Sequence, residues 1–259
     1  MGLIIHQDKI TAEVAAQMQS ICPFGALQYT SGTLTVNAAC RSCKLCVKKG
    51  PHGAATWADE AQKELDKSAW RGVAVFAEMR GGALHPVTLE LLGKARELAA
   101  VTGEPVYAVL IGGGASGLAP ELLHVGADKA YVYDDPVFER FMVSPFAAAF
   151  YDFIQKVKPS SILVGATSIG RSLAPKVAAR CDAGLTADCT VLEMKQNTDL
   201  VQIRPAFGGN IMAQIVTPNT RPQFCTARYK IFSTRERSET TKVEIVNMPV
   251  TDAMRQSKT

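Results

Sequence analysis

The feature that most constrains this chain is a group of cysteines near its N-terminus. Three of them have CxxCxxC spacing, at Cys40, Cys43 and Cys46. This spacing places three thiolates around one small loop, the arrangement that a cubane iron–sulfur cluster requires. A cubane takes a fourth ligand from elsewhere, and Cys22, directly followed by Pro23, lies upstream. We therefore predict one [4Fe–4S] cluster bound by Cys22, Cys40, Cys43 and Cys46.

The surrounding sequence resembles a bacterial-type ferredoxin that has kept one of two clusters. Such proteins carry the run CxxCxxCxxxCP twice, and the last cysteine of each run binds the cluster of the other run. Over residues 12–51, the template puts the ligands of one cluster at Ala12, Ala15, Met18 and Gly50. The four ligands of the other cluster are intact. Random loss of cysteines would not remove all four ligands of one cluster and leave all four of the other. We therefore expect a ferredoxin-like unit with a single cluster.

Zinc and a disulfide are the alternatives for these cysteines. Structural zinc usually takes two CxxC knuckles or Cys/His pairs, and His52 falls outside such a spacing. A disulfide is disfavoured because the N-terminus lacks the charged region and long apolar run of a secretory signal. The other cysteines, Cys181, Cys189 and Cys225, are scattered, and we expect them to behave as small buried apolar residues.

Composition limits the class of protein. The chain has 259 residues, 47% of them hydrophobic and 20% charged, which suits one large or two modest globular domains. A net charge of +4 is too small to indicate nucleic-acid binding. No stretch approaches the roughly 18 apolar residues of a membrane span. We therefore expect neither a nucleic-acid nor a membrane partner, and we expect the chain to lie in a reducing cytoplasm.

The order of elements predicts an α/β chain in four segments. Residues 1–53 form the ferredoxin-like unit, and residues 54–71 read as a polar connecting helix. Residues 72–247 alternate strands and helices, which predicts a mostly parallel sheet covered on both faces. Strands dominate after Asp188, and we expect these to extend the sheet in antiparallel fashion. The polar residues 248–259 read as a linker.

Within this segment, Ser144 followed by Pro145 predicts a helix N-cap. A further helix is expected over residues 171–181, with Pro175 in its first turn.

A glycine-rich loop raises the question of a nucleotide site. Residues 112–117 satisfy GxGxxG, and Asp134 and Asp135 lie where a ribose-binding acid would be. However, the fingerprint belongs to the first strand–helix turn of a dinucleotide fold, and here a whole unit precedes it. We favour a flexible loop over a dinucleotide site. The four histidines are dispersed, and no nucleophile motif accompanies them.

The α/β segment resembles the alpha subunit of electron-transfer flavoproteins over residues 72–235. Four separated motifs occur in the family's order: ILVGATSIGRSLAPKVAAR at 162–180, GLTADC at 184–189, RPAFGGNI at 204–211 and RPQFCTAR at 221–228. The resemblance implies a Rossmann-like domain of the adenine nucleotide alpha hydrolase type. The N-terminal unit is similar to that of the NADH-dependent, electron-bifurcating members found in anaerobes.

The chain departs from the family in two ways. Ala227-Arg228-Tyr229 replaces the usual Val-Arg-Pro. The family's C-terminal FAD domain should begin near residue 260, beyond the end of this sequence.

The resemblance implies an electron-transfer subunit rather than a self-sufficient enzyme. Such a subunit passes electrons between NADH, FAD, ferredoxin and a partner acyl-CoA or hydroxyacid dehydrogenase, by flavin-based bifurcation. It pairs with a beta subunit that holds the bifurcating FAD, while a second FAD belongs to the C-terminal domain. By the same resemblance, Arg204 and Arg228 lie near the partner's flavin. Otherwise, each arginine only ties the end of the sheet together.

Two further interpretations concern partners. Arg41, Lys44, Lys48 and Lys49 form a basic collar that would dock an external acidic ferredoxin, or would only keep a small unit soluble. The chain as a whole has two alternatives from other classes. One is a ferredoxin-tethered, nicotinamide-dependent dehydrogenase that uses the glycine loop, and the other is a ferredoxin-docking adaptor without flavin chemistry.

Overall fold

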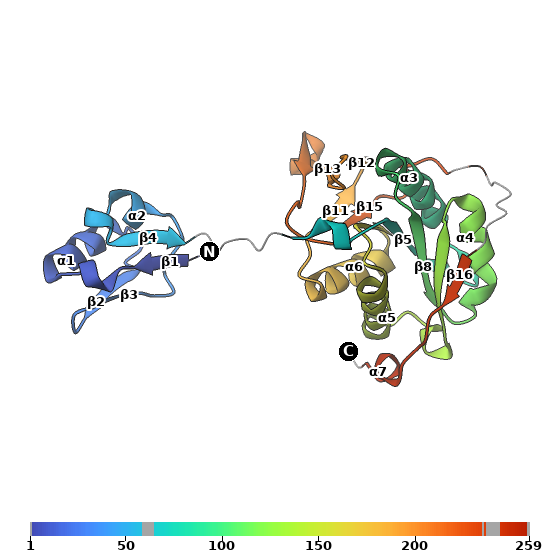
Figure 1. Cartoon of the computed structure of the whole chain (residues 1–259), viewed down its shortest axis with the longest axis horizontal. Coiled ribbons are helices and arrows are strands. Elements are labelled where there is room, and N and C mark those ends of the chain that lie inside the picture. The colour runs from blue at the N-terminus through green and yellow to red at the C-terminus, as the bar shows by residue number, and fades with distance from the viewer. Residues whose placement is uncertain (1, 59–64, 235, 237–243, 258–259) are drawn as a thin grey trace. The chain divides into compact units, whose positions relative to one another are not determined.

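The computed structural model of the chain describes residues 2–58, 65–234, 236 and 244–257 (Figure 1). The chain divides into two compact units, Met1–Glu64 and Leu65–Thr259. Each unit has an apolar core of its own. None of the helices in the described ranges is long and apolar enough to cross a lipid bilayer.

The first unit consists of short elements around a small core. They are β1 (Gly2–Ile5), η1 (Gln7–Lys9), α1 (Ala12–Ile21), β2 (Leu27–Thr30), β3 (Thr33–Val36), α2 (Leu45–Lys49), η2 (Pro51–Gly53) and β4 (Ala55–Ala58). Strands β1 and β4 pair antiparallel, with Gly2 opposite Ala58. Strands β2 and β3 form a hairpin that turns at Ser31 and Gly32, both of which have positive φ.

Helix α1 leads the chain toward the first of the predicted ligands. The Thr11 side chain caps it by accepting a hydrogen bond from the Val14 amide. The helix ends at Cys22, and Pro23 follows, which cannot continue the helical hydrogen bonds. The inner face of α1 contributes to a core made of Ala15, Met18, Leu27, Leu34, Ala54 and Ala55.

The predicted connecting helix over 54–71 is wrong where the structure describes it. Residues 55–58 form strand β4, which completes the first unit beyond the predicted boundary at residue 53. Residues 67–69 form a single 3-10 turn, η3 (Lys67–Ala69), capped by the Asp66 side chain. Residues 59–64 lie outside the described part of the chain. Residues 55–58 form a strand because they pair with β1, some fifty positions earlier. The sequence around residues 55–58 gives no sign of this distant partner.

The second unit is organised around a seven-stranded sheet in the order β11-β15-β10-β5-β8-β9-β16. Its strands are β5 (Val73–Ala77), β8 (Val106–Gly112), β9 (Lys129–Asp134), β10 (Ser161–Gly165), β11 (Leu185–Cys189), β15 (Gln223–Ala227) and β16 (Glu244–Asn247). Its main helices are α3 (Pro86–Thr102), α4 (Ala119–Val125), α5 (Val143–Val157) and α6 (Ser168–Arg180).

Helices cover both faces of this sheet, as the strand–helix alternation predicts. Helices α3 and α4 pack on one face and α5 and α6 on the other (Figure 1). Strand β5 divides its side chains between the two layers: Val73 and Val75 belong to one core, and Ala74 and Phe76 to the other. This alternation is what a central strand of a doubly covered parallel sheet requires.

The expectation that the strands after residue 188 extend the sheet antiparallel is wrong. Strands β11, β15 and β16 all join it in parallel. Strands β12 (Val191–Met194), β13 (Leu200–Ala206) and β14 (Ile211–Ile215) form a separate antiparallel sheet. Every residue of β15 is buried, and a strand buried on both sides fits an interior parallel position between β11 and β10.

Helix ends and the C-terminal segment also differ from expectation. Helix α5 begins at Val143, so Ser144 is not its cap. Helix α6 begins at Ser168 behind the Thr167 cap, which places Pro175 in the helix interior. The expected linker 248–259 contains the short helix α7 (Asp252–Arg255), whose Met254 is buried in the core under α5 and α6.

Candidate metal centre and neighbouring sites

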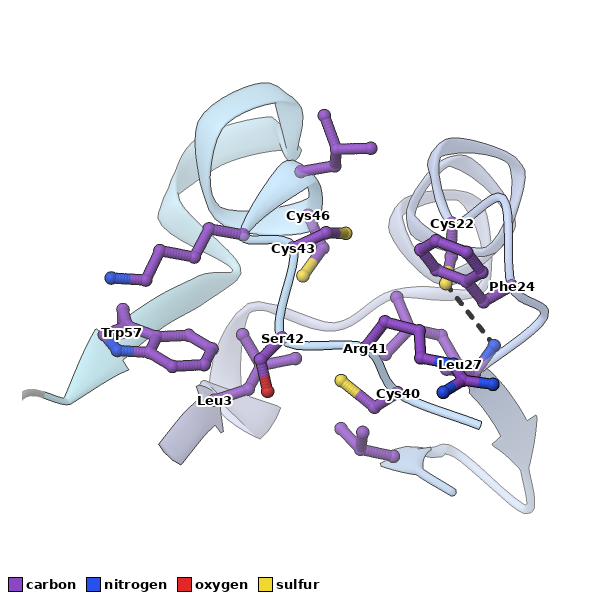
Figure 2. A pocket seen from close by; sticks show the side chains of 14 residues that line it. Leu3, Cys22, Phe24, Leu27, Cys40, Arg41, Ser42, Cys43, Cys46 and Trp57 are labelled. Atoms are coloured by element: carbon purple, nitrogen blue, oxygen red, sulfur yellow. Dashed lines mark hydrogen bonds between the residues drawn. The ribbon is translucent and has the colours of Figure 1, made fainter. Parts of the chain in front are cut away.

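All four predicted ligands line one pocket in the first unit. Figure 2 shows the sulfur atoms of Cys22, Cys40, Cys43 and Cys46 arranged around a common space. All four are free thiols. The other residues that line the pocket are Leu3, Phe24, Ala26, Leu27, Val36, Arg41, Ser42, Lys44, Leu45 and Trp57. The structure therefore brings together the ligand set that the sequence spacing predicted.

Local backbone structure explains why the thiols converge. Cys22 ends α1, where its amide donates to the Gln19 carbonyl at 3.2 Å. Ser42 and Lys44 are both left-handed, with φ of 53° and 60°. These two residues flank Cys43 and curl the loop around the pocket, and left-handed non-glycine residues are uncommon enough to indicate a constrained loop.

The electrostatics of the pocket reflect crowded sulfur atoms. Burial raises the pKa of the Cys46 thiol, the amides of Cys46 and Val47 partly oppose this, and the nearby Cys40 and Cys43 raise that pKa further. The Ala26 amide donates a hydrogen bond to the Cys22 sulfur at 3.4 Å (dashed in Figure 2). Thiolates that repel one another are stabilised by a cationic metal centre, and amide hydrogen bonds to sulfur tune such centres.

Four cysteines are the ligand set of a cubane, and a single zinc ion is the alternative. Among the described residues, no three His, Cys, Asp or Glu side chains are grouped closely enough to hold one metal ion. A zinc site would draw its sulfurs to about 2.3 Å from one centre. A cubane instead attaches each cysteine to a different iron, so its ligand sulfurs stand farther apart. An all-cysteine set of four around one pocket has the number and chemistry that a cubane requires.

Side chains fill the place to which the two-cluster template assigns a second cluster. Ala15 and Met18 are fully buried in the core of the unit. A Cβ atom on Gly50 would lie only 2.7 Å from the Met18 sulfur. Positions 18 and 50, which the two-cluster template assigns to one cluster, therefore meet in space. Met18 occupies that space as a packing residue.

The three remaining cysteines lie in the second unit. Cys189 and Cys225 are buried, as predicted, and Cys181 is half-buried. Burial raises the pKa of Cys181 to about 11. A thiol with so high a pKa is a poor nucleophile and a poor metal ligand at neutral pH.

The glycine loop binds a carboxylate of its own chain. The Gly114 amide donates to Asp134 Oδ1 at 2.7 Å. The amide and hydroxyl of Ser116 donate to Asp134 Oδ2 at 2.9 and 2.6 Å. Partial burial raises the pKa of Asp134, but these hydrogen bonds outweigh it, and the net shift is downward. Amides that would bind a pyrophosphate are turned toward Asp134, which argues against the dehydrogenase alternative.

A second carboxylate, this one buried, lies at the same edge of the sheet. The fully buried Glu78 lies just after β5, at the sheet edge where open α/β folds bind ligands. Its carboxylate accepts hydrogen bonds from Arg80 Nε at 2.7 Å and from the Thr167 hydroxyl at the start of α6. The Glu78 carboxylate therefore lies beside the Thr167 cap of α6, whose hydroxyl also accepts from the Gly170 amide.

The structure places Arg204 and Arg228 beside the same short segment. The Arg228 amide donates to the Cys189 carbonyl at 3.1 Å, and the Thr190 amide donates to the Ile203 carbonyl, next to Arg204, at 2.9 Å. Arg228 is exposed and Arg204 half-buried. Their proximity to a partner's flavin remains a prediction.

Sequence reasoning missed an exposed apolar tip on the small antiparallel sheet. Phe207 is 84% exposed, and Ile211 and Met212 are about half exposed, at 54% and 51%. Gly208 and Gly209, both with positive φ, form the turn between β13 and β14. A phenylalanine followed by two glycines between strands was the available signal, because such a turn cannot bury its aromatic side chain.

Known proteins are similar to most of this chain. The electron transfer flavoprotein domain matches residues 73–253. Subunit LctC of the lactate dehydrogenase (NAD(+),ferredoxin) of Acetobacterium woodii is 58% identical over 236 residues, which cover 91% of this chain and 56% of LctC. The electron transfer flavoprotein subunit alpha of Megasphaera elsdenii is 44% identical over 183 residues, which cover 70% of this chain and 54% of that subunit. The chain spans about half the length of these curated relatives.

Proposed function

The chain belongs to the electron transfer flavoprotein family as an alpha-type protein, and we propose that it relays electrons between one [4Fe–4S] cluster and the flavins of an assembled complex. The observation that carries the proposal is the convergence of four free cysteines on one pocket. When bound, such a cluster supplies one-electron transfer. The residues of the pocket hold it through Cys22, Cys40, Cys43 and Cys46 and exclude water with Leu3, Phe24 and Trp57.

The relatives suggest the reaction that the complex serves. One relative is named as a subunit of a lactate dehydrogenase that uses NAD(+) and ferredoxin, and another as the electron transfer subunit beta of an acryloyl-CoA reductase. We propose that this chain serves a flavin-dependent hydroxyacid or acyl-CoA dehydrogenase, with electrons from NADH divided by flavin-based bifurcation. A cluster of this type and seven free cysteines suit a reducing compartment such as the cytoplasm.

The exposed tip is our candidate for the seam with a beta-type subunit that holds FAD. Phe207, Ile211 and Met212 extend beyond Arg204 on the same hairpin. Apolar side chains beside an arginine are the composition of an interface core. We further propose that Arg204 and Arg228 approach the partner's flavin there, where a guanidinium stabilises an anionic reduced ring. The second FAD that the resemblance implies belongs, in this proposal, to a C-terminal domain of the kind found in the family.

Coexpression with a beta-type subunit tests this assignment. Replacing Phe207→Asp should release the partner and its FAD, because it places a charge at the centre of the proposed seam. Val101→Asp is the matched control, since Val101 is also exposed but lies on α3. The measurement is FAD content after affinity purification. Equal FAD loss in both variants, or none in either, would contradict the seam.

The basic collar is our candidate docking face for an external acidic ferredoxin. Arg41, Lys44, Lys48 and Lys49 are exposed, and none forms an ion pair with a described residue. The sequence from 14 to 58 contains no acidic residue. Uncompensated charge of one sign speeds encounter with a partner of the opposite sign.

Ionic strength and charge reversal test the docking face. Electron exchange with an acidic ferredoxin should slow as the Debye length falls from about 10 Å at 0.1 M salt to about 3 Å at 1 M. At low salt, Lys48→Glu should slow the exchange more than Lys195→Glu, which reverses an exposed charge in the second unit. A rate that responds to neither salt nor Lys48→Glu would mean that ferredoxin binds elsewhere.

A further inference from the structure

The first of the two residues between Cys43 and Cys46 has an unusual backbone. Lys44 has φ of 60° and ψ of 11°, in the left-handed region. Glycine adopts this conformation without strain, and asparagine tolerates it better than other residues. The backbone conformation therefore does not explain why this residue is a lysine. We look to its side chain for the reason.

Lys44 lines the cysteine pocket, and its ammonium contacts another lining residue. Its Nζ atom lies over the indole ring of Trp57, 4.7 Å from the ring centroid. Trp57 lines the pocket next to Leu3, which it faces across the β1–β4 pair (Figure 2). The Trp57 Nε1 atom is buried and has no hydrogen-bond partner among the described residues. The Trp57 ring is therefore held by packing and by the cation–π contact with Lys44, not by a hydrogen bond. The same contact fixes the position of the Lys44 ammonium.

Nothing in the described structure neutralises this ammonium. Lys44 forms no ion pair with a described residue, and the sequence contains no acid between Glu13 and Asp59. Lys44 is exposed, but its ammonium rests on the Trp57 ring, which fixes the position of the charge. Lys48, on α2, has the same charge and is also exposed, but it has no aromatic partner in the described contacts.

We propose that Lys44 and Trp57 form a positioning pair that raises the reduction potential of the cluster. The inference rests on the proposed cluster on the four cysteines. Reduction adds one electron from an external one-electron donor, with no bond or proton exchanged, so the centre becomes more negative by one charge. A cation fixed at the pocket wall stabilises the reduced state more than the oxidised state. Trp57 contributes by keeping that cation in place and by excluding water.

The test is a redox titration of the full chain with dithionite, monitored by electron paramagnetic resonance. Lys44→Asn removes the charge and keeps a residue that tolerates the backbone. It should make reduction less favourable by about tenfold, a downward shift of roughly 59 mV for one electron. Lys48→Asn, the matched control, should shift the potential by less than half as much. Lys44→Arg should retain the wild-type potential, since arginine also stacks on tryptophan.

A double variant separates positioning from simple charge. In a Trp57→Leu background, Lys44→Asn should have a smaller effect than in the wild type, because the cation is no longer held. Equal shifts for Lys44→Asn and Lys48→Asn, or strict additivity with Trp57→Leu, would overturn the pair. If Lys44→Asn does not assemble a centre, Lys44→Gly replaces it. Wild-type protein without iron and sulfide would overturn the proposed cluster itself, which is a separate failure.

Discussion

The two units of the chain are stabilised in different ways. The second unit has two apolar layers rich in large side chains, and Phe76, Phe138, Phe150 and Phe153 are fully buried or nearly so. The core of the first unit has six buried members, and three of them are alanines. A unit this small buries too little surface to be stable by packing alone. The comparison teaches that the second unit has enough apolar core to fold through its own side chains, whereas we propose that the first depends on a cluster bound by its cysteines.

The two tryptophans allow each unit to be followed separately. Trp57 lines the cysteine pocket, and Trp70 packs at the edge of a core of the second unit. Since the chain has only these two, a Trp70→Phe background reports on the first unit and a Trp57→Phe background on the second.

Removing one cysteine ligand should have the largest effect. Cys43→Ser is expected to abolish the cluster and unfold the first unit, because metal binding supplies its folding free energy. The second unit should keep its melting temperature. Iron analysis and thermal melts in the two tryptophan backgrounds measure both. Cys181→Ser, a change in the second unit, should leave the iron content unchanged. Loss of both units together would show that they are not independent.

A cavity in the core of the second unit should destabilise that unit and leave the first unit unaffected. Phe150 is fully buried and stacks on Phe76 with ring centroids 5.4 Å apart. Phe150→Ala should reduce the unfolding free energy of this unit by about 3–5 kcal/mol. Phe207→Ala removes the same side chain from a site that is 84% exposed, and should change stability by less than about 0.5 kcal/mol. Urea unfolding followed by Trp70 fluorescence decides this, and the cluster signal should persist in both variants.

Acid should weaken the second unit through a buried ionic group. Asp199 contacts Lys67 Nζ and Arg221 Nη2, each at 2.8 Å, and the Arg221 side chain is fully buried. Burial raises the pKa of Asp199, but the hydrogen bonds from Lys67 and Arg221 outweigh it and lower that pKa. A lowered folded-state pKa stabilises above the unfolded value of about 3.9, and this contribution disappears as pH falls through the folded value.

Asp199→Asn makes this dependence measurable. It should destabilise the second unit by about 3–5 kcal/mol at neutral pH, because it leaves Arg221 buried without a counter-charge. It should also flatten the loss of stability below about pH 4. Unfolding curves at several pH values provide the test. An unchanged acid profile would mean that other carboxyl groups dominate.

The smallest expected effect concerns the glycine loop. Asp134→Asn weakens the hydrogen bonds from Gly114 and Ser116, and should cost about 1 kcal/mol. Neither the wild type nor the variant should bind NAD in equilibrium dialysis, because the loop is shaped around a side chain of the chain itself. Micromolar NAD binding by the wild type would restore the dehydrogenase interpretation.

Sequence reasoning succeeded where the signal was local. The cysteine spacing predicts one shared site for Cys22, Cys40, Cys43 and Cys46, and all four line one pocket; their role as cluster ligands stays a prediction. The strand–helix alternation predicted a parallel sheet covered on both faces. Both signals reflect constraints that a few neighbouring residues impose.

Sequence reasoning failed where a distant partner decides the structure. The local sequence predicts a helix where strand β4 forms, because the pairing partner β1 is far away in sequence. Strand β15 lies between β10 and β11 in the sheet. The strand–helix alternation stops before this strand, so the sequence pattern does not show where in the sheet it pairs. The role of Asp134 was hidden because a ribose-binding acid and an internal cap have the same spacing from the loop.

Metal analysis of the anaerobically purified chain tests the central claim most directly. One cubane on the four cysteines predicts about four iron and about four acid-labile sulfide per chain. Loading the cluster should strongly quench Trp57 fluorescence in the Trp70→Phe background and leave Trp70 fluorescence in the Trp57→Phe background nearly unchanged. About eight iron per chain, zinc in place of iron, or full iron content in a Cys22→Ser variant would contradict the account.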